Sequence, residues 1–357
     1  MIDLDDKQAV QTLDKSNLLG SVEQLPNQVR QTWEDVSKFE VPESYQQIRN
    51  VVVAGMGGSA LGARIIQGLY FDQLKIPLTI VNGYDLPQFV NQETLVILSS
   101  YSGTTEETLS SFSHAKERGA KIVGIAVGGK LPELLNADGY PMFVFEPKYN
   151  PCNQPRMAIG YSVLAQLGVF QKAGLIDLAQ EEVAGIIQTL EEANTKFGFG
   201  VSTAGNLAKQ IAQKFFGKDI ILVGSEFLTG NTHTFQNQLH ENSKNFATYL
   251  IIPELNHHSM ESLSHPLTNS ENLIFLMINS DLYFSKVKTR FEVTKDVITR
   301  NKIEVLGFKP QASSKLLQSF ETLAFGSYVC FYLAMLNELD PSPIPWVDYF
   351  KEKLSQV

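Results

Sequence analysis

The chain has 357 residues, of which 43% are hydrophobic and 19% are charged, a composition typical of a folded globular protein of about two domains. Its formal net charge of −9 argues against a nucleic-acid-binding surface, because no basic face offsets the acidity. Its two cysteines, Cys152 and Cys330, are too far apart to indicate a metal cluster or a disulfide framework, so we expect a cytoplasmic protein without a bound metal.

Residues 1–48 form the first predicted segment. The acidic start lacks the apolar core of a signal peptide, so we expect no secretion signal there. Apolar residues then recur at helical spacing, for example at Val10, Leu13 and Val36. We therefore expect residues 1–48 to be a helical segment that precedes the first domain.

Strands and helices alternate across residues 49–150. Short apolar runs predict strands near 50–54, 78–82, 94–99, 121–126 and 142–145. A helical pattern over 106–118 ends at Gly119, which is a favoured C-terminal capping residue. This alternation predicts an α/β domain, with a doubly wound parallel sheet covered by helices on both faces.

A glycine-rich loop, Gly55–Ala63, follows the first of these strands. Its glycines allow the backbone to turn tightly and to approach a ligand closely. A glycine-rich turn with a purely structural role would have the same sequence pattern. The loop also fits a dinucleotide-binding pattern, but the next strand ends in Asn82, where that pattern needs an acidic residue. We therefore rank a dinucleotide enzyme below an enzyme that binds a sugar phosphate.

A second loop, Ser100–Thr108, follows the strand near 94–99. It combines hydroxyl side chains with Gly103, and Glu106 and Glu107 fall in the first turn of the predicted helix. Free N–H groups and hydroxyls at a helix N-terminus bind an anion without lysine or arginine. Two such loops, each after a buried strand, favour a phosphorylated small molecule as the ligand.

The remainder of the chain predicts a helical linker, a second domain and a tail. Residues 151–200 are expected to be the linker, 201–340 the second domain and 341–357 the tail. Within the second domain, strands are predicted at 219–223, 247–252, 273–279 and 303–307. The turn Gly224-Ser225 repeats the strand–Gly–Ser–helix order of the first domain, and Leu323–Leu336 is expected to be a buried helix rather than a membrane span. A short helix ending at Val357 is expected to close the chain.

Several polar residues of the second half could carry proton-transfer chemistry. Glu241 lies in the run His240-Glu241-Asn242-Ser243-Lys244, and His257 and His258 follow Pro253-Glu254. Taken alone, each of these is more often a surface residue. Arg156 is as readily a salt-bridge partner, and Lys351 near the C-terminus would ordinarily be solvated.

Together these motifs resemble a known family. Gly55–Ala60, Ser100–Thr108, Pro155-Arg156, residues 240–244, residues 253–257 and the closing Phe350, Lys351 and Leu354 are similar in order and spacing to the bifunctional phosphoglucose/phosphomannose isomerases. That family is built from a pair of SIS (sugar isomerase) domains. The resemblance implies two flavodoxin-like SIS domains, each with a doubly wound parallel sheet, with flanking N- and C-terminal helices.

The resemblance also implies a role for each matching residue. Ser100, Ser102 and Thr105 would bind the phosphate, with Gly57, Gly58 and Ser59 against the sugar. Glu241 would move a proton between C2 and C1, and Arg156 would stabilise the enediolate. His257 and Lys351 would assist ring opening side by side, although His258 adjoins His257 where the family commonly has asparagine.

The implied activity is interconversion of glucose 6-phosphate, and also of mannose 6-phosphate, with fructose 6-phosphate through a cis-enediol. No cofactor and no metal are implied, and the expected assembly is a homodimer with shared active sites that binds neither nucleic acid nor membrane. Two alternatives stay open. One is a non-catalytic SIS protein that senses a sugar phosphate, and the other is a different SIS sugar-phosphate isomerase.

Overall fold

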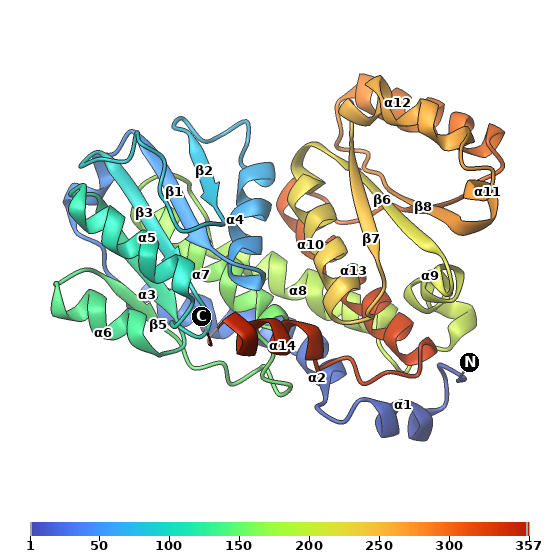
Figure 1. Cartoon of the computed structure of the whole chain (residues 1–357), viewed down its shortest axis with the longest axis horizontal. Helices are drawn as coiled ribbons and strands as arrows, with labels where there is room; N and C mark the ends of the chain where they lie inside the picture. Colours follow the sequence, from blue (N-terminus) through green and yellow to red (C-terminus); the bar gives the residue numbers. More distant parts are fainter. Residues whose placement is uncertain (1, 355, 357) are drawn as a thin grey trace.

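The computed structural model describes residues 2–354 and 356, which form two α/β halves side by side (Figure 1). The helices are α1 (Lys7–Leu13), α2 (Leu18–Glu23), α3 (Leu25–Ser37), α4 (Gly58–Leu69), α5 (Glu106–Glu117), α6 (Lys130–Ala137), α7 (Ile159–Lys172), α8 (Gln180–Phe197), α9 (Leu207–Phe215), α10 (Thr229–Glu241), α11 (Asn269–Asn272), α12 (Ser285–Arg300), α13 (Lys315–Leu336) and α14 (Pro345–Leu354). The strands are β1 (Asn50–Gly55), β2 (Leu78–Val81), β3 (Thr94–Ser99), β4 (Lys121–Ala126), β5 (Met142–Val144), β6 (Asp219–Ser225), β7 (Ala247–Ile252), β8 (Leu273–Ile278) and β9 (Glu304–Phe308). Short 3₁₀ helices are η1 (Glu43–Gln46), η2 (Pro155–Met157), η3 (Thr203–Gly205), η4 (Glu226–Leu228), η5 (Glu254–His257) and η6 (Ser259–Ser264).

The first sheet is parallel throughout and has the strand order β2-β1-β3-β4-β5, which is the flavodoxin-like order. Its side chains alternate between two cores. Val51 and Val53 of β1 join the main core of the molecule, whereas Val52 and Ala54 face a smaller core that contains residues of α5 and α6. The predicted doubly wound sheet with helices on both faces is therefore confirmed.

The second sheet is also parallel and has the order β7-β6-β8-β9. This order matches that of β2-β1-β3-β4, so the predicted structural repeat is present. The predicted turn differs in detail, because Gly224 and Ser225 are the last residues of β6. The Ser225 hydroxyl donates to the carbonyl of Ile252 at 2.6 Å, and a Cβ atom on Gly224 would lie 2.0 Å from Thr232 Oγ1. Neighbouring atoms therefore fill the space at this second turn, unlike at the glycine-rich loop after β1.

The core between the halves is built on α13, the most apolar helix. By length and composition α13 could cross a membrane, but its apolar window is wholly buried inside the fold. This confirms the prediction of a buried helix over Leu323–Leu336. The halves also meet where α4 packs against α10, and there a Cβ atom on Gly230 would lie 2.2 Å from the carbonyl oxygen of Arg64. The two sheets are therefore held in one packed unit.

The chain ends differ in how they are attached. Asp5 accepts hydrogen bonds from the buried Lys209 ammonium at 2.7 Å and from Thr203, which ties the N-terminal segment to α9. By contrast, none of the residues of α14 is buried, and this helix lies across the lower edge of the molecule (Figure 1). The helix predicted at the C-terminus is present, and its predicted end, Val357, lies outside the described residues.

Candidate active site

The glycine-rich loop joins β1 to α4 as the sequence predicts. Gly57 has φ +50° and ψ −129°, a conformation that side-chain-bearing residues avoid. Gly58 packs against the backbone of Arg156, since a Cβ atom at Gly58 would lie 3.1 Å from the Arg156 Cα. The two glycines therefore bring this loop directly against the predicted catalytic arginine.

The hydroxyl loop joins β3 to α5. The hydroxyls of Ser100 and Thr105 lie 2.9 Å apart, and the Gly103 amide donates to the Ser100 hydroxyl at 3.1 Å. Gly103 has φ +66°, and a Cβ atom there would lie 1.8 Å from the Gly128 carbonyl oxygen. Ser102 is exposed, and no described side chain caps the N-terminus of α5. The first-turn amides of α5 are therefore open to an anion.

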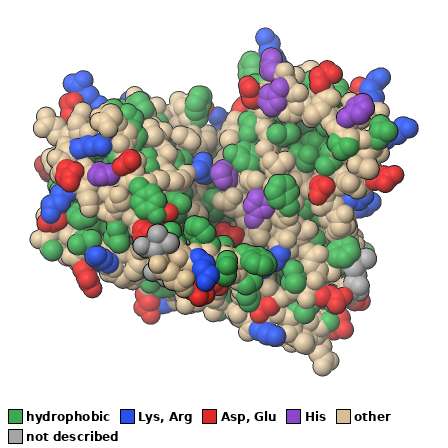
Figure 2. All heavy atoms as spheres, viewed as in Figure 1, with side chains coloured by type: hydrophobic (Ala, Val, Ile, Leu, Met, Phe, Trp, Pro, Cys, Tyr) green, Lys and Arg blue, Asp and Glu red, His purple; other side chains and the backbone are tan. Residues whose placement is uncertain are grey.

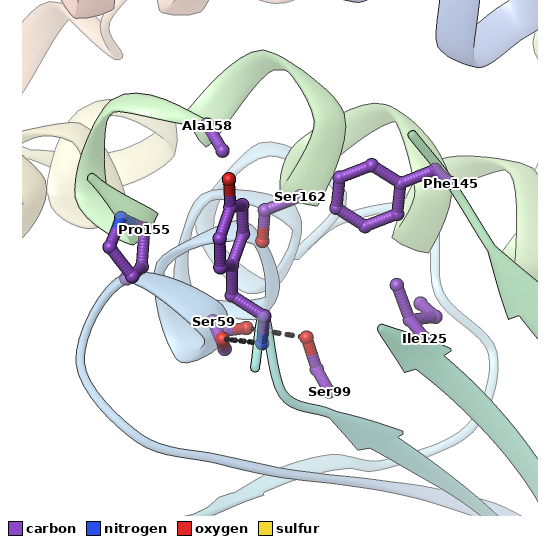
Figure 3. A pocket seen from close by; sticks show the side chains of 9 residues that line it. Ser59, Ser99, Ile125, Phe145, Pro155, Ala158 and Ser162 are labelled. Carbon is purple, nitrogen blue, oxygen red and sulfur yellow. Dashed lines mark hydrogen bonds between the residues drawn. The ribbon is translucent and has the colours of Figure 1, made fainter. Parts of the chain in front are cut away.

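Ser59 ties the two loops together. Its carbonyl accepts hydrogen bonds from the Ser99 hydroxyl at 2.9 Å and from Gln166 at 3.0 Å, and its hydroxyl accepts from the Tyr101 amide at 2.9 Å. Beneath them is a cavity of about 10 Å³, which has room for about one water molecule. Figure 3 shows Ser59 and Ser99 on its floor, with Pro155 and Phe145 on opposite sides. The loops thus form one connected unit.

Arg156 of η2 is buried, and its guanidinium is held from several directions. Nε donates to Asn242 Oδ1 at 2.6 Å, and Nη1 donates to Gln154 Oε1 at 2.9 Å. Nη2 donates to the carbonyls of Pro341 at 2.9 Å and Ser342 at 2.8 Å. Burial lowers the pKa of Arg156. Of the five N–H groups of a guanidinium, these bonds occupy four and leave one on Nη1.

Glu241, the last residue of α10, lies near Nη1, the nitrogen that carries the remaining N–H group. Its Oε2 lies 3.7 Å from Arg156 Nη1, close enough for an ion pair but too far for a hydrogen bond. The Glu241 side chain is 31% exposed, whereas that of Arg156 is 3% exposed. The carboxylate therefore lies at the rim of the site, with space for a ligand oxygen beside a fixed positive charge.

His257 lies elsewhere in the same chain. Glu241 precedes β7 and His257 follows it, so they lie at opposite ends of this six-residue strand, which is about 17 Å long. Asn256, the neighbour of His257, bonds to Thr294 and Arg290 of α12. His257 and His258 are both exposed.

Lys351 lies on exposed α14, whose approach starts at the Arg156-bound carbonyls of Pro341 and Ser342. Asp348, one helical turn before Lys351, is close enough to Arg156 to influence its pKa. In Figure 1, α12 lies at the top of the second half, whereas α14 lies low in the view, where the two halves meet. Within one chain α14 starts on the Arg156 side of β7 and His257 lies on the other side, so the expectation that Lys351 lies beside His257 stays a prediction that requires a second copy of the chain.

Residues outside the predicted set also contribute to this site. Gln154 and Asn242 orient Arg156, and Lys244 donates to the carbonyl of Pro341 at 2.9 Å. Asn242 and Lys244 lie in the same short run as Glu241, so their positions were visible in the sequence although their contacts were not. Among the residues that the structure describes, no group of three His, Cys, Asp or Glu side chains could hold a metal ion.

The surface is hollowed between the two halves, and histidine and basic side chains line the walls of this hollow (Figure 2). His233 of α10 belongs to the contact between the halves. Burial and the neighbouring charge of Arg64 lower the pKa of His233 to about 4. The His233 ring lies 4.9 Å from that of Tyr249. The His233 side chain is therefore uncharged at neutral pH in the folded protein.

Similarity to solved structures defines the class of fold. A hypothetical protein from Thermus thermophilus aligns with a TM-score of 0.75 at 17% identity, covering 98% of this chain and 94% of the other. The C-terminal domain of glucosamine-fructose-6-phosphate aminotransferase from Francisella tularensis aligns with a TM-score of 0.68 at 13% identity, covering 91% and 97%. Residues 204–354 match the family described as the bacterial phospho-glucose isomerase C-terminal SIS domain. The fold is thus that of a double SIS protein.

Sequence similarity identifies the family. The bifunctional phosphoglucose/phosphomannose isomerase of Caldicellulosiruptor bescii is 33% identical over 94% of this chain and 98% of its own length. The protein of the same name from Thermoplasma acidophilum is 30% identical over 91% of this chain and 96% of its own length. The chain belongs to the bifunctional phosphoglucose/phosphomannose isomerase family, as its motifs predicted.

Proposed function

We propose that this protein is an isomerase that interconverts glucose 6-phosphate and mannose 6-phosphate with fructose 6-phosphate. Membership of the family supports this activity. The observation that carries the proposal is the pairing of Glu241 with Arg156, whose remaining N–H group is on the nitrogen that lies 3.7 Å from the carboxylate. The contact of Gly58 with Arg156 supports the proposal, because it brings the glycine-rich loop against this arginine.

The phosphate is proposed to bind at the hydroxyl loop. Ser100, Ser102 and Thr105 supply hydroxyl donors, and the uncapped N-terminus of α5 supplies amides and a favourable dipole. Gly57, Gly58 and Ser59 would then lie along the sugar. Because the phosphate takes no part in the chemistry, its binding energy can orient the reacting carbons.

The proposed reaction moves one proton from carbon to carbon. In the open-chain aldose the Glu241 carboxylate removes the proton on C2, and the electron pair forms the C1–C2 double bond while the π pair of the C1 carbonyl moves onto O1, which gives the enediolate. The same carboxyl group then returns the proton to C1, while a proton passes from O2 to O1, which leaves the C2 ketone. The remaining N–H of Arg156 would stabilise the developing oxyanion, and its fixed orientation lowers the reorganisation needed.

Ring opening is assigned to His257 and Lys351 by similarity to the family. Because β7 separates His257 from Glu241, a complete site needs a second copy of the chain, so we propose a homodimer with shared active sites. In that assembly Lys351 would come from the same chain as Arg156, because the segment that leads to α14 is bonded to Arg156. Because its substrates are sugar phosphates, we assign the proposed enzyme to the cytoplasm.

Substitution of the proposed base tests this function. We expect Glu241→Gln to lower kcat for glucose 6-phosphate by at least about a hundredfold with KM almost unchanged, since loss of a general base typically costs about 10² to 10⁴. Glu117→Gln, at an exposed position late in α5, serves as the control and should retain full activity. Wild-type turnover in Glu241→Gln would remove Glu241 as the base. A wild-type protein that binds the sugar phosphate without turning it over would instead indicate a non-catalytic SIS protein.

A further inference from the structure

One backbone carbonyl, that of Pro341, accepts hydrogen bonds from two cationic side chains. Arg156 Nη2 donates to it at 2.9 Å, and Lys244 Nζ donates at 2.9 Å. Arg156 also donates to the next carbonyl, that of Ser342, at 2.8 Å. Pro341 and Ser342 are both buried. This short stretch, residues 341–342, is the root of the C-terminal segment that carries α14.

The rest of that segment has little packing of its own. None of the residues of α14 is buried, and Trp346 is 82% exposed. Exposed helices of this length are only marginally stable in water without tertiary contacts. The position of α14 therefore depends strongly on the bonds made at its root.

Lys244 is placed in a costly conformation to make its bond. It follows α10 with φ +58°, in the left-handed region that a lysine adopts only at an energetic cost. From there Nζ also donates to the carbonyl of Glu241 at 2.5 Å. Lys244 thus connects the end of α10, which carries the proposed base, with the root of the C-terminal segment.

Charges of both signs surround Lys244, which shares the Pro341 carbonyl with a second cation. Arg156 opposes the positive charge of Lys244, whereas Glu241 and Asp340 favour it. Removing Lys244 would leave Arg156 as the single side-chain donor to the Pro341 carbonyl. The same two hydrogen bonds of Arg156 would then have to fix residues 341–342 and also orient the guanidinium.

We propose that Lys244 is a positioning residue for the isomerase reaction, holding the C-terminal segment on Arg156 and thereby keeping the guanidinium aimed at Glu241 and α14 at its place. This inference rests on the proposed function. It differs from a catalytic role because Lys244 acts through the Pro341 carbonyl and not on the substrate.

The charge state of Lys244 gives one readout. Partial burial and the nearby Arg156 charge lower the pKa of Lys244 to about 8, so its charge is lost as the pH rises through 8. Arginine stays charged throughout this range. We therefore expect kcat of the wild type to fall as the pH rises above 8, and kcat of Lys244→Arg to fall less.

The decisive experiment combines kinetics with hydrogen exchange of full-length variants. In Lys244→Met we expect kcat for glucose 6-phosphate to fall about tenfold with KM nearly unchanged, since misplaced groups lose alignment more than affinity. Amides of residues 343–354 should exchange faster in the same variant. Lys244→Arg should restore both properties in large part. Lys302→Met removes a lysine that also has positive φ, 61°, and should match the wild type in both measurements.

Hydrogen exchange and kinetics together distinguish a failure of the Lys244 proposal from a failure of the proposed function. Unchanged exchange of residues 343–354 in Lys244→Met would overturn the proposal whatever the activity, because the segment would not depend on Lys244. Faster exchange with unchanged kcat would also overturn it, because the catalytic pair would not depend on the segment. If the wild type showed no isomerase activity, the proposed function would fail, whereas the exchange result would still report the contact.

Discussion

At the scale of single residues, Arg156 shows how the site is set before any substrate arrives. Four of its five N–H groups are engaged by Asn242, Gln154, Pro341 and Ser342, which come from three separate parts of the chain. A guanidinium held in this way cannot rotate to follow a substrate. Its one remaining N–H is therefore a preorganised donor, of the kind that stabilises charge developing in a transition state.

A comparison of Gly103 in the hydroxyl loop with Gly119, just after α5, tests how closely the loop is packed. Gly103 and Gly119 both have positive φ, but a Cβ atom on Gly103 would lie 1.8 Å from a backbone oxygen, whereas Gly119 has open space around it. We expect Gly119→Ala to cost about 1 kcal/mol of unfolding free energy through strain alone, with KM unchanged. Gly103→Ala should cost more and should raise KM for glucose 6-phosphate severalfold. Equal losses measured by urea unfolding would show that the Gly128 contact is unimportant.

A second residue-scale prediction concerns acid stability and His233. The pKa of His233 is lowered to about 4 in the fold, from an ordinary value near 6.5, mainly by burial. Between these values the unfolded chain binds more protons than the folded one, so the unfolding free energy should fall as the pH falls from 6.5 to 4. His233→Gln should lose this part of the pH dependence. Urea unfolding across that range measures it, and a pH-independent difference between the two proteins would contradict it.

At the scale of elements, the strands were the most predictable feature. Apolar, β-branched runs such as residues 50–54 and 94–99 became central parallel strands, because strands buried on both faces need continuous apolar sequence. The separation of Glu241 from His257 could also have been read from the sequence. Both flank the predicted strand 247–252, and residues on either side of one strand lie at opposite ends of it.

The contacts of the C-terminal segment could not be predicted in the same way. The bonds from Arg156 to Pro341 and Ser342 join residues 185 and 186 positions apart in sequence. Such contacts depend on how the two halves pack and leave no local pattern. The sequence therefore suggested that Lys351 belongs to the site, but it did not show that the segment carrying Lys351 is attached through Arg156.

The two exposed lysines of α14 make this point testable. Lys351→Ala should lower kcat for the cyclic sugar phosphate by at least about tenfold, because we propose that Lys351 assists ring opening from the helix that starts beside Arg156. Lys353→Ala is the internal control, since its ammonium lies 5.7 Å from the ring of Tyr349 on the same helix. Neither change should alter the unfolding free energy by more than about 0.5 kcal/mol. If both variants keep full turnover, Lys351 is not part of the active site.

At the scale of the whole molecule, the site draws on both halves. Glycine and hydroxyl loops come from the first half, Glu241 comes from the second, and Arg156 lies between them in sequence. Packing of α4 against α10 fixes the halves relative to each other, with Gly230 allowing close approach. Within the second half, β7 keeps Glu241 and His257 at its opposite ends, so this packed contact between the halves does not bring them together in one chain.

Subunit mixing tests whether a second copy completes the site. Glu241→Gln and His257→Ala should each be nearly inactive alone. If Glu241 and His257 of one site come from different chains, a hybrid dimer holds one site with both substitutions and one site with neither. Random reassociation of equal amounts should then recover about one quarter of the wild-type activity, because half of the dimers are hybrids and each has one intact site.

Mixing Glu241→Gln with Arg156→Ala is the matched control. That hybrid has no intact site if both residues come from one chain, as their 3.7 Å contact indicates. No recovery with His257→Ala would mean that Glu241 and His257 of one site come from the same chain, whereas recovery in the control would contradict the pairing of Arg156 with Glu241 within one chain.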